Sequence, residues 1–86
     1  MADRKIRVLG VNITNRVKQA KELQELFSEY GCYIKTRIGL HTVTDEFCST
    51  SGLVILELFG EENKQKELEQ KIRSFEGVEV EKMVFN

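Results

Sequence analysis

The stretch that decides the fold runs from Ile34 to Phe59, IKTRIGLHTVTDEFCSTSGLVILELF. Two runs rich in β-branched and aliphatic residues enclose a polar segment, a pattern typical of two strands and a connecting loop. We expect strands at Cys32–Leu40 and Gly52–Phe59, joined by the loop His41–Ser51. A hairpin needs a loop of only about two to five residues, and long loops often carry binding residues. This loop holds the chain's single histidine, His41, and one of its two cysteines, Cys48.

The segment before this stretch predicts a strand and a helix. Lys5–Ile13 is aliphatic and β-branched, as expected of a strand. Thr14 or Asn15 then offers a side-chain oxygen to cap a helix. Gly31 is expected to end that helix in the left-handed conformation. Helical spacing places these residues on one apolar stripe: Val17, Ala20, Leu23, Phe27 and Tyr30.

The segment after it predicts a second helix and a last strand. The helix follows Gly60, and its apolar stripe is Leu68, Ile72 and Phe75. The charged run EENKQKELEQK within it is interpreted as a solvated helix face. Gly77 ends the connection, and Val78–Phe85 forms the last strand.

The order β-α-β-β-α-β is the split βαβ pattern of a ferredoxin-like α+β fold. We expect one domain over residues 1–86, with a four-stranded antiparallel sheet in the order 4-1-3-2. Both helices are expected on one face of that sheet.

Side-chain alternation places apolar residues on both faces of the first, third and fourth expected strands. Two helices can cover only one face of the sheet. In the third strand Val54, Leu56 and Leu58 oppose Leu53, Ile55 and Phe59. At about 25 cal/mol per Å², an uncovered apolar face forgoes several kcal/mol. We therefore expect a homodimer or a dimer of dimers, joined through open sheet faces or edge strands. The alternative is a monomer with scattered surface hydrophobic residues.

Composition excludes several classes of protein. Thirteen basic and fourteen acidic side chains give a formal charge of −1, and we expect no direct nucleic-acid binding. No segment is apolar enough for a signal peptide or a membrane span, so we expect a cytoplasmic protein that does not associate with membranes. Two cysteines make no disulfide framework.

The candidate ligand-binding residues are Arg37, His41 and Cys48. Arg37 is expected on the open sheet face, together with Arg7 and Glu57. There it would clamp a carboxylate or phosphate, or pair with Glu57. His41, Cys48 and the loop hydroxyls suit a small polar or anionic ligand, and the alternative is a disordered loop.

The residues of the loop match neither a known metal-binding pattern nor a recognisable catalytic pattern. His41, Asp45, Glu46 and Cys48 are possible ligands, but their spacing matches no closed zinc pattern. We therefore expect no metal, no cofactor and no catalytic residues. Cys32 is expected to be a small buried residue of the second strand.

Several short motifs resemble a family of small bacterial proteins described as iron-only hydrogenase system regulators. These motifs are Arg37-Ile38-Gly39-Leu40, the aliphatic strand after Gly52, and Gly77-Val78 with Lys82. The resemblance implies an ACT-like, ferredoxin-like regulatory domain that assembles through its sheets. The fold also resembles the C-terminal, metal-sensing domain of nickel-responsive repressors.

This chain differs from the nickel sensors and from the ACT domains at particular positions. The nickel sensors carry several histidines around this hairpin, whereas this chain has only His41. ACT domains usually have a glycine-containing turn where this chain has residues 12–15. We expect no DNA-binding segment before the domain, so a transcriptional role is expected to need a separate partner.

Together these features predict a non-enzymatic regulatory or small-ligand-sensing module that self-associates, such as a transcriptional or hydrogenase-system regulator. One alternative is a small dimeric α+β-barrel enzyme using His41 as acid and base. Another is a metal-binding sensor acting through His41 and Cys48.

Overall fold

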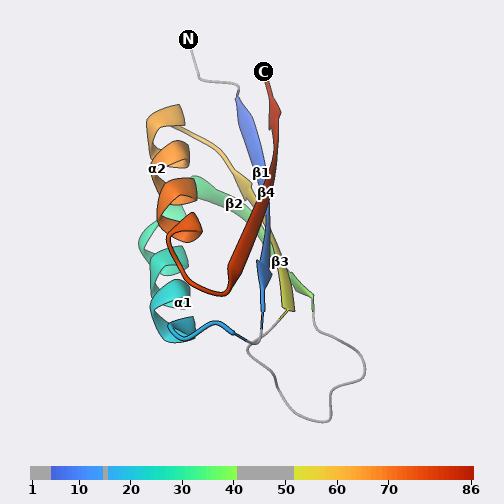
Figure 1. Ribbon diagram of the computed structural model, residues 1–86. Coiled ribbons are helices and arrows are strands. Elements are labelled where there is room, and N and C mark those ends of the chain that lie inside the picture. The colour runs from blue at the N-terminus through green and yellow to red at the C-terminus, as the bar shows by residue number, and fades with distance from the viewer. Residues whose placement is uncertain (1–4, 15, 41–51) are drawn as a thin grey trace.

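Four strands and two helices follow one another in the predicted order (Figure 1). The computed structural model describes residues 5–14, 16–40 and 52–86. The elements are β1 (Ile6–Ile13), α1 (Ala20–Glu29), a 3₁₀ turn (Gly31–Tyr33), β2 (Ile34–Leu40), β3 (Gly52–Leu58), α2 (Glu62–Arg73) and β4 (Val78–Phe85). The antiparallel sheet has the order β2-β3-β1-β4, which is the predicted order read from the opposite edge. The ferredoxin-like α+β fold is therefore confirmed.

The hydrophobic core lies between the sheet and the two helices, which cover the same sheet face (Figure 1). Strand alternation and helical spacing bring together the residues that were predicted for β1, β3 and the helices. The fully buried members are Leu9, Val11, Leu23, Leu56, Leu58, Leu68 and Ile72, with Phe27 almost fully buried. No helix among residues 5–14, 16–40 and 52–86 is long and apolar enough to cross a membrane.

The first helix begins later than expected. The predicted cap at Thr14 is wrong, because α1 starts at Ala20 and follows Gln19. The Thr14 hydroxyl instead donates to the carbonyl of Gly77 at 2.7 Å and accepts from the amide of Arg16 at 3.2 Å. Thr14 thus ties the β1–α1 connection to the turn before β4. Asn15, the other predicted cap, lies outside the described residues.

A β-bulge in β2 reverses the predicted side-chain alternation. Ile34 pairs with Leu58, but Thr36 pairs with Glu57, so Lys35 is an extra residue between them. One inserted residue moves every later side chain to the opposite face. Arg37 therefore lies on the helix-covered side, and the prediction that it lies on the open face was wrong, whereas Ile38 lies on the open side.

Two further expectations around β2 were wrong. Gly31 does not have a positive φ, because the chain leaves α1 through the 3₁₀ turn. Cys32 lies in that turn rather than in the strand, and it is exposed rather than buried.

Among the glycines compared at residues 10, 31, 39, 60 and 77, Gly77 leaves the least space for a side chain. Its φ is +80°, and a Cβ atom would lie 2.5 Å from the backbone nitrogen of Val17. We expect Gly77→Ala to lower the free energy of unfolding by at least about 2 kcal/mol, because the left-handed conformation alone costs about 1–2 kcal/mol. Chemical denaturation measures the loss. The control is Gly31→Ala, where nothing lies within 4 Å of the added methyl group. Equal effects of the two substitutions would contradict the close packing at Gly77.

Candidate functional site

The sheet face opposite the helices, called the open face below, is the first candidate site. Register pairs place on it residues from all four strands: Ile6, Val8, Gly10, Asn12, Thr36, Ile38, Leu53, Ile55, Glu57, Glu79, Glu81, Met83 and Phe85. Several large apolar side chains on this face are open to solvent. Met83 is 57% exposed, Phe85 53% and Ile38 48%. The open face is therefore an apolar surface with two acidic residues, Glu79 and Glu81, on its β4 edge.

A hollow lies on this face beside Glu79 and Glu81. Its volume is about 420 Å³, and its lining is Gly10, Asn12, Leu53, Glu79, Val80 and Glu81. The missing side chain of Gly10 opens it, since an added Cβ would meet nothing closer than the Glu81 carbonyl oxygen at 3.9 Å. Asn12 Nδ2 donates to Glu79 Oε1 at 2.8 Å on its rim. An apolar wall with two nearby carboxylates suits a positively charged or hydrogen-bond-donating group.

The predicted site residues do not gather on the open face. Arg37 points to the helix side, where its guanidinium lies 4.9 Å from the ring centre of Phe27 and donates to Gln24 Oε1. The pairing of Arg37 with Glu57 is wrong, because Arg37 lies on the helix side whereas Glu57 lies on the open face, where it accepts a hydrogen bond from Thr36 at 2.9 Å. His41 and Cys48 lie outside the described residues. Ligand binding by Arg37, His41 and Cys48 therefore stays a prediction.

The alternative metal ligands Asp45 and Glu46 also lie outside the described residues. Within residues 5–14, 16–40 and 52–86, no three histidine, cysteine or acidic side chains are grouped to hold a metal ion.

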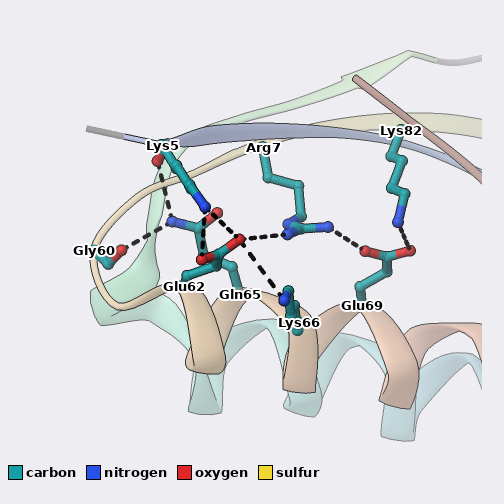
Figure 2. Close-up of polar contacts among 8 residues, drawn as sticks. All are labelled: Lys5, Arg7, Gly60, Glu62, Gln65, Lys66, Glu69 and Lys82. Carbon is teal, nitrogen blue, oxygen red and sulfur yellow. Dashed lines mark hydrogen bonds and ion pairs between the residues drawn. The ribbon is translucent and has the colours of Figure 1, made fainter. Parts of the chain in front are cut away.

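The second candidate site is a charged cluster between α2 and the sheet (Figure 2). Figure 2 shows Arg7 of β1 pointing toward α2, between Glu62 and Glu69. Arg7 Nη1 donates to Glu69 Oε1 at 2.8 Å, and Arg7 is only 3% exposed. The expectation that Arg7 points to the open face was wrong, because Arg7 shares the alternation of Leu9 and Val11.

Each carboxylate of the cluster is shared by three cations. Glu62 contacts Lys5 at 3.1 Å, Lys66 at 3.8 Å and Arg7 at 3.9 Å. The cluster therefore joins the start of α2 to β1.

Glu69 also contacts Arg73 at 2.9 Å and Lys82 of β4 at 3.3 Å. Arg73 in turn donates to the Val80 carbonyl at 3.0 Å. These contacts tie α2 to β4 as well as to β1.

Gln65 completes the cluster. It is fully buried, and its Nε2 donates to the carbonyls of Gly60 at 3.0 Å and Lys5 at 3.3 Å. The charged run of α2 is thus not a solvated face throughout. Gln65, Leu68, Glu69 and Ile72 have the three- and four-residue spacing of one helix face, and this signal could have identified the two buried polar residues.

The electrostatics of the cluster keep Glu69 ionised. Burial disfavours the charged carboxylate, but hydrogen bonds from Arg73 and Lys82 outweigh burial and hold the pKa of Glu69 below its ordinary value of 4.5. A negative charge is therefore maintained beside the buried Arg7 guanidinium.

Comparison with known proteins identifies the fold and no function. No family model and no curated protein matches the sequence. A solved structure of uncharacterized protein TM1266 from Thermotoga maritima is similar, with a TM-score of 0.78 and 19% sequence identity. The match covers 96% of this chain and 100% of that chain. At this identity the similarity shows a shared fold alone.

Loss of the Glu69 charge should destabilise the protein strongly. We expect Glu69→Gln to lower the free energy of unfolding by about 3 kcal/mol, because it removes the nearest counter-charge of a buried guanidinium. Denaturant titration at pH 7 measures the loss. Glu25→Gln is the matched control, since the same chemical change at an exposed position of α1 should cost less than about 0.5 kcal/mol. A comparable loss in both variants would contradict a structural role for the cluster.

The lowered pKa of Glu69 also predicts a pH dependence. As the pH falls below about 5, the unfolded chain takes up this proton before the folded protein does, so acid lowers the free energy of unfolding. The stabilisation by Glu69 is complete above this range and is lost as the pH falls through the depressed folded pKa. The difference in unfolding free energy between the unsubstituted protein and Glu69→Gln should therefore be larger at pH 7 than at pH 3. A difference that does not change with pH would show that Glu69 is not the responsible group.

Proposed function

We propose that this chain is a non-enzymatic regulatory module that self-associates by stacking its open faces and responds to a small ligand. The observation that carries the proposal is the apolar sheet face, which neither helix covers and on which several large side chains of the described residues are exposed. With about 200 Å² for a fully exposed side chain of this size, Ile6, Ile38, Leu53, Met83 and Phe85 together present roughly 500 Å² of apolar surface.

The size of this surface supports a second copy as its cover. The largest apolar patch on a typical monomer is about 300–600 Å², and a standard interface buries about 800 Å² per partner. Val8 and Ile55, which are half-buried, and the polar residues of the open face add further area to that of the exposed apolar side chains. The whole open face is thus comparable to one side of a standard interface.

The distribution of charge is compatible with this arrangement. The acidic residues Glu79 and Glu81 lie on β4, at one edge of the sheet. A two-fold axis parallel to the strands places β4 of one copy over β2 of the other. Glu81 then faces the region of Ile38 rather than its own equivalent, so like charges are kept apart.

The ligand-sensing part of the proposal rests on the loop at residues 41–51 and on Arg37. The loop joins β2 and β3, the two strands on one side of the open face. Ligand binding there by Arg37, His41 and Cys48 would be coupled to self-association through these strands. The resemblance to iron-only hydrogenase system regulators extends the proposal to control of transcription or of a hydrogenase system through a partner.

Self-association through the open face is tested by placing a charge on it. We expect the unsubstituted protein to sediment as a dimer or larger assembly at micromolar concentration, and Ile38→Lys to shift it to smaller species. Ile38 is half exposed, so the substitution should leave the fold intact, as circular dichroism can verify. Gln70→Lys on the exposed side of α2 is the control.

A monomer near 10 kDa for the unsubstituted protein would contradict the proposal. Native mass spectrometry of protein from its own host tests the ligand. A bound mass that His41→Ala abolishes is expected, and a mass of polypeptide alone would contradict ligand sensing.

A further inference from the structure

We propose that the end of β4 pairs edge to edge with β4 of a second copy, in an antiparallel register centred on Val84. This inference rests on the proposed self-association and adds a second contact to it. Among the described strands, β4 lies at an edge of the sheet and is hydrogen-bonded to β1 alone. Its last residues are apolar and exposed on both faces. Met83 and Phe85 lie on the open face, whereas Val84 pairs with Arg7 and points to the helix side.

Stacking of open faces cannot cover Val84. Its side chain is 42% exposed and points away from the open face. A strand added beside β4 contacts side chains on both faces and also satisfies the free backbone groups of the edge. An added strand is therefore the partner geometry that this end of β4 fits.

Two other parts of the sheet edges have features that oppose pairing. At β2 a bulge interrupts the strand, and Lys35 and Arg37 are exposed there. In the first half of β4, the Val80 carbonyl already accepts a hydrogen bond from Arg73. Bulges and charges are common means by which proteins prevent edge pairing. The stretch from Met83 to Phe85 has neither.

Like charges restrict the possible registers. In a symmetric antiparallel pair of identical strands, the central residue faces its own copy in the other strand. The residue before the centre in one strand then faces the residue after the centre in the other. A register centred on Glu81 or Lys82 places that residue against itself, and one centred on Val80 places Glu79 against Glu81. Directly opposed like charges are destabilising. Registers centred on Met83, Val84 or Phe85 avoid such pairs.

The register centred on Val84 gives the best contacts of these three, because centring on Phe85 places Val84 against the polar Asn86. Val84 faces Val84, and Met83 faces Phe85 on both sides of the centre. Lys82 faces Asn86, which is uncharged. Centring on Met83 would instead place Glu81 against Phe85. The self-complementary apolar triplet therefore identifies a second copy of this chain as the occupant.

This pairing would enlarge the surface used for face-to-face association. The two-fold axis is perpendicular to the sheet, so both open faces point in the same direction. Met83 and Phe85 of the two copies become neighbours in one continuous eight-stranded sheet. Two such sheets stacked through their open faces form a dimer of dimers.

Cysteine cross-linking tests both the contact and its register. The background is Cys32→Ser and Cys48→Ser, and single cysteines replace Val84, Met83 or Glu79. Facing residues of antiparallel strands have Cα atoms roughly 4.5–5.5 Å apart, within disulfide range. Under mild oxidation Val84→Cys should give covalent dimer at least tenfold faster than Glu79→Cys, the control on the same strand. Cross-linking no faster than the control, or faster through Met83→Cys, overturns the proposal.

A second measurement separates this contact from the open-face contact. In the cysteine-free background, Val84→Lys places like charges opposite each other on the helix side and should reduce a tetramer to an open-face dimer. Ile38→Lys should leave the Val84→Cys cross-linking rate unchanged. If Ile38→Lys abolishes that cross-link, the edge contact is not independent and the inference fails. If the protein is a dimer that Ile38→Lys leaves intact and that cross-links through Val84→Cys, the edge contact stands and the open-face proposal fails.

Discussion

The structure depends on one geometric constraint, which is that two helices cover only one face of a four-stranded sheet. Side-chain alternation makes both faces of β1 and β3 apolar, so the helix-covered face supplies the core and the other face stays open. In the core, residues of β1, β3 and β4 pack on apolar residues of the two helices, among them Leu23, Phe27, Leu68 and Ile72. The same alternation that builds this core also exposes Ile38, Met83 and Phe85. Fold and assembly surface therefore have a common origin.

Sequence pattern predicts this fold well where a strand is regular. The faces of β1, β3 and β4 and the strand order follow from period-two alternation and element order. β2 differs because the bulge at Lys35 adds one residue, and the polar run Lys35-Thr36-Arg37 gives no sign of which residue is extra. The late start of α1 is likewise invisible locally, since Thr14 bonds to Gly77, which is distant in sequence.

The candidate sites were predicted less completely than the fold. The ion pair between Arg7 and Glu69 was missed although both residues occupy core positions of their periodic patterns. Charged residues are seldom buried, and that general rule outweighed the periodicity. Pairing explains the exception, because each buried charge has its counter-charge within 2.8 Å. Arg37 was placed on the wrong face for the separate reason of the bulge.

The charged cluster and the edge of β4 are physically connected. A lysine on an edge strand usually discourages pairing with another strand. Lys82 is the last charged residue of β4, but Glu69 holds its amino group at 3.3 Å on the α2 side. The charge is thus directed toward the helix and away from the residues that follow it. Arg73, bound to the same carboxylate, occupies the Val80 carbonyl. One buried carboxylate therefore holds Arg73 near the Val80 carbonyl and Lys82 on the α2 side, whereas Met83, Val84 and Phe85 are left open to a partner strand.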